Sequence, residues 1–282
     1  MKNCKMYCLC INNKDLKIIQ NLDYIPVGLG ADKFSNEWLT DKTLDNISHK
    51  NSFYGEYTFH YWFWKNLLPK IEENEWIGFC AYRDYWAKEK VEILEKYKFA
   101  NQERLEDLNQ INNLVLKEIP ESWHKYDTII GEPLHLDYPL KMSKILKHGI
   151  KSIIRNPNAI FKKGRNIKFQ FDMFHGNGIL DQAIDLLNEE NRKNFKNYVN
   201  QETSYNSGNM FICKSKIIME NYYKTLFEWL KRCENLFGFD LKGYDKIRIY
   251  AFLAERFLPY WFHKNTKVKE WPILFYDLNK QN

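Results

Sequence analysis

Apolar residues recur along the chain in short runs bounded by turn residues, a pattern typical of buried β-strands. Six such runs predict strands at Lys5 to Ile11, Tyr24 to Leu29, Trp76 to Tyr82, Tyr126 to Ile130, Asn209 to Cys213 and Ile273 to Tyr276. Longer stretches with helical spacing predict helices at Ser52 to Leu68, Gln102 to Glu118, Asp181 to Tyr198, Ile218 to Phe237 and Tyr244 to Phe262. Because strands alternate with helices, we expect an α/β fold with a mainly parallel central sheet.

A basic segment at about 137–168 interrupts this alternation. It holds nine Lys or Arg against one Asp, and its formal charge of +8 exceeds the +6 of the whole chain. Apolar residues at helical spacing within it predict an amphipathic helix that ends at Asn156-Pro157. With 282 residues and 44% hydrophobic composition, the chain can bury one large core, so we expect a single domain carrying this segment as an insertion.

Several classes of protein are disfavoured by what the sequence lacks. The six cysteines form no C-x-x-C pair, which disfavours a zinc site. The N-terminal apolar run is too short for a signal peptide, and no segment approaches 18 apolar residues, so we expect a cytoplasmic protein. The basic segment lacks interleaved aromatic residues and nucleic-acid recognition motifs, so no nucleic-acid partner is expected.

Two of the predicted strands end in residues suited to contact a ligand, charged side chains in one and glycines in the other. In "NEWIGFCAYRDYW" a strand ends in Arg83 and Asp84, set between aromatic rings. These two residues form either a surface ion pair or a ligand site in which Arg83 binds phosphate and Asp84 meets a metal. In "IPVGLGADKF", Gly28 and Gly30 at a strand end either make a tight turn or let a ligand approach the backbone.

Three further stretches place polar groups beside apolar ones. The helix predicted within "DNISHKNSFYGEYTFHYWFWKN" begins at Asn51 or Ser52 and carries Tyr61 on a polar face. In "SYNSGNMFICKSK", Asn206 and Asn209 lead directly into a strand. The apolar helix in "IRIYAFLAERFLPYWF" carries charged residues that are costly to bury unless they are paired or bind a ligand. These are Arg248, Glu255 and Arg256. Standard phosphate-binding motifs, the P-loop and G-x-G-x-x-G, are absent.

Taken in this order, these motifs resemble a bacterial family of glycosyltransferases encoded in capsular and lipopolysaccharide gene clusters, from about Tyr24 to Asn265. The family's third motif usually reads C-H-Y-R-R-Y-F. Cys80, Tyr82, Arg83 and Tyr85 match it, whereas Ala81 and Asp84 depart from it. The resemblance implies a GT-A-like nucleotide-sugar-binding fold. It also implies a nucleotide-sugar donor and a saccharide acceptor, lipid-linked at the inner face of the cell membrane.

The resemblance also implies roles for individual residues. We expect Asp181 as the catalytic base, with His175 as the alternative. Glu255 is expected either to orient the arginines or to bind sugar hydroxyls. No D-x-D motif is present, so Mn²⁺ or Mg²⁺ would have Asp84 as its ligand, or the basic residues would neutralise the diphosphate without metal. Donor binding is expected from Val27, Gly28, Gly30, Asn46, Lys50, Asn51, Tyr61, Trp64, Arg83, Asp84, Asn206, Asn209, Arg248 and Arg256.

The sequence therefore predicts a glycosyltransferase of capsule or lipopolysaccharide synthesis, transferring a hexose or a pentose, galactofuranose included. The alternative is a noncatalytic module that uses the basic segment to bind polyanions or an anionic membrane surface. Saturable binding of a nucleoside diphosphate favours the enzyme. Salt-sensitive binding of anionic vesicles without nucleotide binding favours the module.

Overall fold

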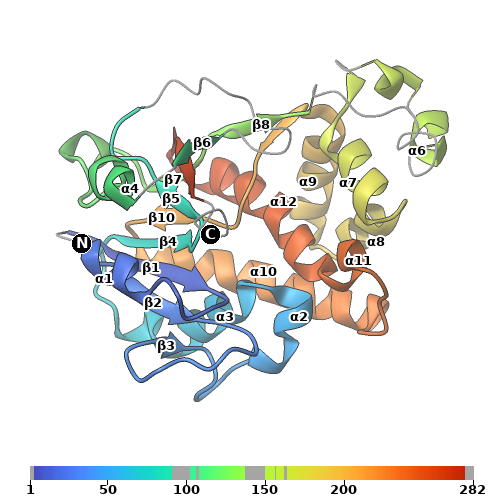
Figure 1. The fold of residues 1–282 in the computed structure, drawn as a ribbon. Helices are drawn as coiled ribbons and strands as arrows, with labels where there is room; N and C mark the ends of the chain where they lie inside the picture. The colour runs from blue at the N-terminus through green and yellow to red at the C-terminus, as the bar shows by residue number, and fades with distance from the viewer. Residues whose placement is uncertain are drawn as a thin grey trace.

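The computed structural model describes residues 3–90, 102–105, 108–136, 150–155, 157–161 and 164–276. Within these ranges, ten strands form one sheet with helices packed on both of its faces (Figure 1). The predicted α/β fold with a mainly parallel central sheet is confirmed. Neighbouring strands of the sheet follow the order β11-β7-β10-β4-β1-β2-β3. In addition, β5 pairs with β4 and β12, and β12 pairs with β6.

The parallel part of the sheet contains its most regular strands. β1 (Lys5–Cys10) lies between β2 (Ile25–Gly28) and β4 (Ile77–Ala81), and β3 (Leu39–Thr40) extends the sheet beyond β2. All four strands run in the same direction. Their carboxyl ends therefore meet at one edge of the sheet, the edge where ligands bind in open α/β folds.

The remaining strands bring distant parts of the chain to the same sheet. β10 (Phe211–Cys213) pairs antiparallel with β4 and with β7 (Thr128–Gly131), and β11 (Val268–Trp271) runs parallel to β7. β12 (Ile273–Tyr276) pairs with β5 (Asp84–Trp86) and β6 (Gln102–Leu105). A separate ribbon joins β8 (Pro133–His135) to β9 (Ser204–Asn206).

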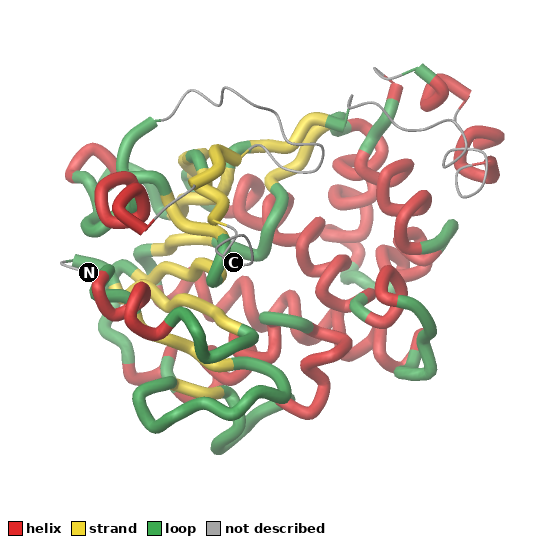
Figure 2. The backbone as a smooth tube through the Cα atoms, in the orientation of Figure 1, coloured by secondary structure: helices red, strands yellow, loops and turns green. Residues whose placement is uncertain are grey.

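Eleven α-helices are assigned within the described ranges, and Figure 2 shows most of them to one side of the strands. Their bounds are α1 (Leu16–Asn21), α2 (Asn51–Tyr54), α3 (Tyr57–Asn66), α4 (Leu108–Leu114), α6 (Ile150–Arg155), α7 (Ile167–His175), α8 (Ile179–Asp185), α9 (Glu189–Gln201), α10 (Lys216–Phe237), α11 (Tyr244–Ile247) and α12 (Ile249–Asn265). Single 3₁₀ turns are η1 (Ser48–Lys50), η2 (Leu68–Lys70), η3 (Glu121–Trp123) and η4 (Pro157–Ile160).

Successive side chains of a strand point to opposite faces of the sheet, so each face packs into its own hydrophobic cluster. In β1, Tyr7 and Leu9 pack into the larger cluster, which includes residues of α3, α10 and α12. Met6, Cys8 and Cys10 point to the opposite face and join the cluster of α1 and α4. All six cysteines are buried thiols, so they act here as small apolar side chains.

Five of the predicted strands coincide with observed strands to within two residues at each end, and Ile273 to Tyr276 coincides with β12 at both. The predicted helix at Gln102 to Glu118 is wrong in its first half. There β6 pairs in parallel with β12, and tertiary pairing overrides the local helical pattern. Three other predicted helices are each divided in two. The breaks lie at Gly55-Glu56, between Asp185 and Glu189, and at Arg248.

Half of the predicted basic insertion, including Leu140, Lys144 and Lys147, lies outside the described residues. Within it, α6 and η4 are described, so part of the expected helix is present. Across the described ranges, none of the helices combines the length and the hydropathy needed to span a membrane.

Candidate functional site

A cavity of about 500 Å³ lies at the carboxyl edge of the parallel strands. Its apolar wall comes from the ends of three strands. Leu9 lies in β1 and Ile11 directly follows it, Leu29 directly follows β2, and Cys80 and Ala81 end β4. This volume is within the range of small-molecule sites, about 300–1,000 Å³. Polar residues complete the wall and come from four segments of the chain. They are Asn51, Ser52, Glu56, Tyr82, Arg83, Asp84, Ser207, Asn209, Tyr244 and Arg248.

The turn between β4 and β5 carries Arg83 into this wall, and Asp84, the first residue of β5, follows it. The Tyr276 N–H donates to the Arg83 carbonyl oxygen at 2.7 Å and fixes the turn to β12. The Arg83 guanidinium carbon lies 4.9 Å from the Tyr82 ring centroid and 5.8 Å from that of Phe275. Among the described residues Arg83 has no carboxylate partner, so its hydrogen-bond donors are available to an anion.

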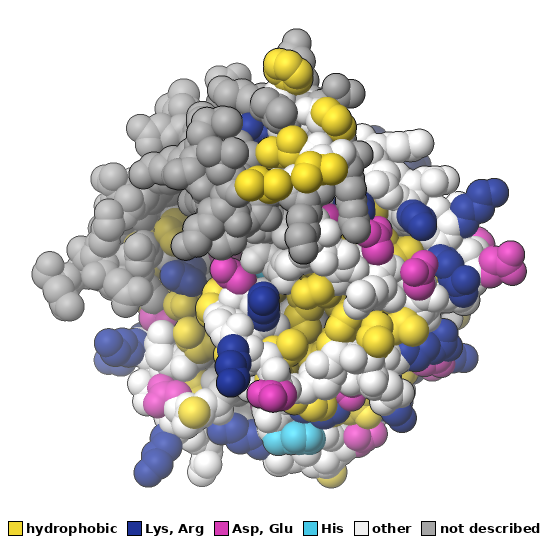
Figure 3. Space-filling model, turned by 90° about the vertical axis from the view of Figure 1, so that its right-hand side faces the viewer, with side chains coloured by type: hydrophobic (Ala, Val, Ile, Leu, Met, Phe, Trp, Pro, Cys, Tyr) yellow, Lys and Arg dark blue, Asp and Glu magenta, His cyan; other side chains and the backbone are white. Residues whose placement is uncertain are grey.

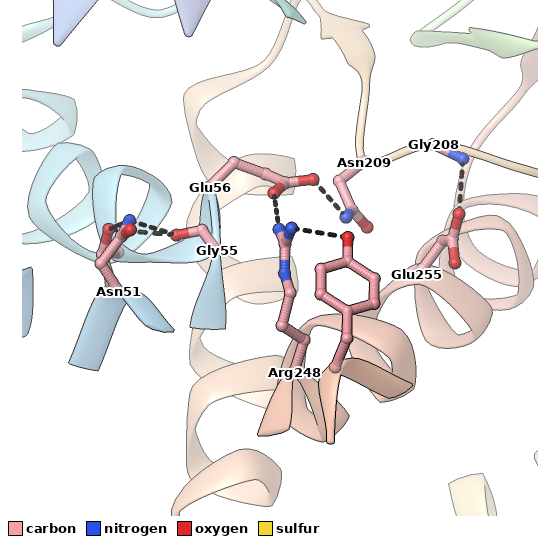
Figure 4. Close-up of polar contacts among 9 residues, drawn as sticks. Asn51, Gly55, Glu56, Gly208, Asn209, Arg248 and Glu255 are labelled. Carbon is pink, nitrogen blue, oxygen red and sulfur yellow. Dashed lines mark hydrogen bonds and ion pairs between the residues drawn. The ribbon is translucent and has the colours of Figure 1, made fainter. Parts of the chain in front are cut away.

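The break between α2 and α3 brings a second group of residues to the cavity. Gly55 ends α2 with φ 55° and ψ −134°, a conformation that glycine adopts readily. Asn51 Nδ2 donates to the Gly55 carbonyl oxygen at 3.0 Å and to Thr58 Oγ1 at 3.1 Å, which closes the turn. Glu56 follows at the start of α3 and lines the cavity, with its carboxylate directed toward Asn209 and Arg248 (Figure 4).

The Glu56 carboxylate links three separate segments of the chain, as Figure 4 shows. Asn209 Nδ2 donates to Oε1 at 2.6 Å, and Arg248 Nη2 lies 3.2 Å from Oε2. Arg248 Nη1 in turn donates to the Tyr244 hydroxyl at 3.0 Å. The side chains of Glu56 and Arg248 are about 30% exposed, so their ion pair is in contact with solvent and is modest in energy.

Glu255 and Arg256 act behind the wall and do not line it. Glu255 Oε1 accepts from the Gly208 N–H at 2.9 Å and so supports the loop that precedes β10. Arg256 is 2% exposed. It pairs with Glu255, donates to Gln170 Oε1 at 2.9 Å and lies 4.6 Å from the Tyr205 ring centroid. Arg256 therefore stabilises the fold behind the cavity, although the sequence suggested contact with the diphosphate.

The two predicted bases, Asp181 and His175, lie on α8 and α7 and do not line the cavity. Asp181 Oδ2 is 2.8 Å from Lys168 Nζ. His175 is buried, its Nδ1 is 3.0 Å from the Asp245 carbonyl oxygen, and its ring stacks on Phe252 at 4.0 Å. Burial, together with the nearby Arg256, lowers the pKa of His175 to about 3. A group with such a pKa is a weak base at neutral pH.

Of the predicted donor-binding residues, Asn51, Arg83, Asp84, Asn209 and Arg248 come together around the cavity. Val27 is fully buried, and the space beside Gly28 is filled by the Phe34 ring. Gly30 has φ 79° and faces Asn51. Lys50 pairs with Glu234, Tyr61 donates to Asp45, and Trp64 stacks on Phe227. Asn46 Oδ1 accepts from the Ser48 N–H at 3.2 Å, and Asn206 Nδ2 donates to the Gly131 carbonyl oxygen at 2.7 Å.

Four residues that line the cavity were not predicted from the sequence as site residues. They are Glu56, Ser52, Tyr244 and Ser207. A signal for Glu56 was present, because a carboxylate directly after a glycine inside an apolar helical stretch marks a break. The pairing of Glu56 with Asn209 and Arg248 joins positions 153 and 192 residues apart, which no local pattern encodes.

In the described part of the chain, two carboxylates line the cavity, those of Glu56 and Asp84. Among the described residues no group of three or more His, Cys, Asp or Glu is placed to hold a metal ion. Mg²⁺ commonly uses one or two carboxylates together with substrate phosphates, so Asp84 has the donor chemistry for such an ion. Of the lining residues that the structure describes, four are charged, and Glu56, Arg83, Asp84 and Arg248 sum to zero formal charge.

A family model described as a domain of unknown function (DUF4422) matches residues 6–266. Among solved structures, the apo structure of WbbM, described as a bifunctional glycosyltransferase, matches with a TM-score of 0.65 at 19% identity. The match covers 98% of this chain and 45% of that chain. It shows a shared fold, in agreement with the GT-A-like expectation. No curated protein sequence matches this chain.

Proposed function

The chain belongs to the DUF4422 family, and from this premise we propose that it is a glycosyltransferase that uses a nucleotide-sugar donor. The fold is shared with a protein described as a bifunctional glycosyltransferase. The cavity also lies where nucleotides bind in open α/β sheets, at the carboxyl ends of parallel strands. These two findings support a donor site at this edge.

The observation that carries the proposal is the presence of two guanidinium groups, from different elements, in one cavity. Arg83 comes from the turn after β4, and Arg248 comes from the junction of α11 and α12. Guanidinium groups form charge-assisted, often bidentate, hydrogen bonds with phosphate oxygens. We assign both to the diphosphate of the donor, whose negative charge grows on the leaving group as the glycosidic bond breaks.

A divalent cation would supply further neutralisation of this charge. Among the described residues of the wall, Glu56 and Asp84 offset the two arginines, so these residues carry no net positive charge. Mn²⁺ or Mg²⁺ bound by Asp84 would supply that charge when present. Without an ion, Arg83 and Arg248 hold the diphosphate by themselves.

The acceptor hydroxyl must lose its proton as it attacks the anomeric carbon, so a base is required. Asp181 remains the base that we propose, with His175 as the alternative. For Asp181 to act, the acceptor must reach α8, outside the cavity lining. Glu56 and Asp84, which do line the cavity, are the competing carboxylates.

We assign the acceptor to a growing, lipid-linked saccharide of capsule or lipopolysaccharide synthesis, at the inner face of the cell membrane. Exposed apolar side chains support attachment to that surface. Ile154 is 73% exposed and Phe161 is 70% exposed, and both lie in the segment that carries nine Lys or Arg. Figure 3 shows the side of the molecule on which α6 lies, with hydrophobic side chains gathered at the top. Transfer of a hexose or a pentose, galactofuranose among them, belongs to the same proposal.

The same segment favours a second candidate, a noncatalytic module that binds polyanions or an anionic membrane surface. The two functions differ in one measurement, the binding of nucleotides. The enzyme binds a nucleoside diphosphate saturably at the cavity. The module binds anionic vesicles or heparin and gives no thermal shift with nucleotides.

The test is a thermal-shift screen of nucleoside diphosphates and their sugars, with and without Mn²⁺, followed by calorimetry on Arg83→Ala. A charge-assisted hydrogen bond is worth about 1.5–3 kcal/mol. We therefore predict affinity about tenfold to hundredfold weaker in this variant. Arg232→Ala, on α10 and outside the cavity, is the matched control and keeps the affinity of the parent protein. Equal affinity in the parent and a folded Arg83→Ala removes Arg83 from the donor site.

A further inference from the structure

Gly55 ends α2 in a backbone conformation that side-chain-bearing residues rarely adopt, with φ 55° and ψ −134°. A turn of this kind requires glycine for conformational reasons alone. The surroundings of Gly55 show a second reason, which concerns Arg248.

The space that a side chain would take at Gly55 is occupied by the Arg248 guanidinium. A Cβ added at Gly55 would lie 2.3 Å from Arg248 Nη2 and 3.2 Å from its Cζ. The next residue, Glu56, holds the same nitrogen at 3.2 Å through Oε2. Gly55 and Glu56 together therefore make a seat for the guanidinium, formed by an absent side chain and a carboxylate (Figure 4).

The seated guanidinium keeps hydrogen-bond donors for a ligand. Arginine has five N–H donors, of which one is directed at Glu56 and one at the Tyr244 hydroxyl. The other donors have no hydrogen-bond partner among the described residues. Because Arg248 lines the cavity and is 31% exposed, these donors are within reach of an anion that enters.

We propose that Gly55 is a positioning residue whose missing side chain seats Arg248, with Glu56, in a conformation ready to bind the donor's diphosphate. The identity of the anion rests on the proposed function, whereas the seating itself does not. An unseated arginine must give up its rotamer freedom when it binds an anion, and a seated one has already done so. Displacing the guanidinium should therefore weaken anion binding without any change in the charge of the cavity.

The chain provides a matched control for the backbone effect of a substitution at Gly55. Gly238 ends α10 with φ 61° and ψ −156°, close to the dihedral angles of Gly55. An added Cβ at Gly238 meets no atom within 4 Å. Gly55→Ala and Gly238→Ala therefore impose similar backbone strain, and Gly55→Ala alone moves Arg248.

The experiment measures, by calorimetry, the binding of a nucleoside diphosphate and of inorganic pyrophosphate to folded variants. We expect both ligands to bind at least about tenfold more weakly to Gly55→Ala, the effect of losing one charge-assisted hydrogen bond. Gly238→Ala should bind them as the parent protein does. In an Arg248→Met background, which keeps the aliphatic stem, Gly55→Ala should cause no further loss.

Each other outcome has a definite meaning. Unchanged binding in Gly55→Ala, or an equal loss in the Arg248→Met background, overturns the seating of Arg248 and leaves the proposed function standing. If pyrophosphate binding depends on Gly55 as expected but no nucleotide sugar supports transfer, the seat is upheld and the proposed function fails. If the parent protein binds neither ligand, both are overturned.

Discussion

At the scale of single residues, the three arginines predicted to bind the donor have different surroundings. Arg256 is 2% exposed and bonded to Glu255 and Gln170, whereas Arg83 and Arg248 line the cavity. In the sequence Arg248 and Arg256 lie eight residues apart on one apolar helical stretch, so local pattern treats them alike. Only their partners from distant segments separate the structural arginine from the two that can meet a ligand.

The proposed base can be tested by a substitution that keeps the shape of the side chain. We predict that Asp181→Asn slows transfer by about 10²- to 10⁴-fold, because an amide cannot take the acceptor's proton. Donor affinity should be nearly unchanged, since Asp181 does not line the cavity. Lys168 keeps its contact with Asp172 at 2.6 Å, so the local fold has an anchor in the variant. Turnover and donor binding are measured on the same preparation.

Four further substitutions distinguish Asp181 from the other candidate bases. Glu189→Gln, an exposed position on α9, is the control that should retain normal turnover. Normal turnover in Asp181→Asn combined with loss in Glu56→Gln or Asp84→Asn moves the base into the cavity. Loss in His175→Gln alone would assign the base to His175.

At the scale of elements, two helix breaks contribute charged side chains to the cavity wall. Glu56 lies where α2 gives way to α3, and Arg248 lies where α11 gives way to α12. A continuous helix would carry either side chain in a regular register along its own axis. The breaks instead turn the two side chains toward each other at 3.2 Å.

The buried ring of His175 packs α7 against α12, and its pKa makes this packing sensitive to pH. Because burial lowers the folded-state pKa to about 3, the unfolded chain takes up a proton near pH 6.5 and the folded chain does not. His175 therefore destabilises the fold progressively as pH falls from about 6.5 toward 3, by up to about 1.4 kcal/mol per pH unit. We predict that the stability of the parent protein, relative to His175→Gln, falls between pH 7.5 and pH 5.

Urea unfolding at both pH values measures this difference directly. His49→Gln, a substitution at an exposed position, is the control. Its difference in stability from the parent protein should be the same at both pH values. Since His60 and Asp15 also have shifted pKa values, in opposite directions, the parent's own pH profile is not diagnostic. An unchanged difference between the parent and His175→Gln would show that the ring is solvated in solution.

The strands were more predictable from the sequence than the site was. β1, β4 and β10 follow from short apolar runs, because strand burial is encoded locally in residue type. The first half of the predicted Gln102 helix failed, because β6 exists through its pairing with β12 about 170 residues later. Arg83 and Asp84 were found from their position after a strand. Glu56 was not, because its partners Asn209 and Arg248 are remote in the sequence.

At the scale of the whole molecule, charge is distributed unevenly. The segment at about 137–168 carries a formal charge of +8, while the chain as a whole carries +6. Ile150, Ile154 and Phe161 of this segment are exposed, and such side chains favour contact with an apolar phase. A combination of cations and exposed apolar residues is typical of reversible attachment to anionic membranes.

Attachment through the basic segment can be tested by removing its positive charge. Each cation near an anionic membrane contributes up to about 1 kcal/mol, so three or four engaged cations give useful binding. We predict that replacing Lys144, Lys147, Lys151 and Arg155 with Gln releases the protein from vesicles containing anionic lipid. Activity on a lipid-linked acceptor should fall with it. Donor binding and activity on a soluble acceptor analogue should remain, because the described lining residues of the cavity come from other parts of the chain.

Two controls separate a specific contact from general charge and general hydrophobicity. Replacing Lys193, Lys196, Lys224 and Lys231 with Gln removes the same charge from exposed positions on α9 and α10 and should leave vesicle binding intact. Ile154→Ser and Phe161→Ser should weaken vesicle binding, whereas Ile217→Ser, which is 61% exposed on α10, should not. If the four substitutions in the basic segment abolish donor binding as well, the segment contributes to the active site and the membrane assignment is wrong. If the variant with these four substitutions still binds vesicles at low salt, the membrane contact lies elsewhere. Electrostatic attraction by these cations is strongest at low salt, where screening is weakest.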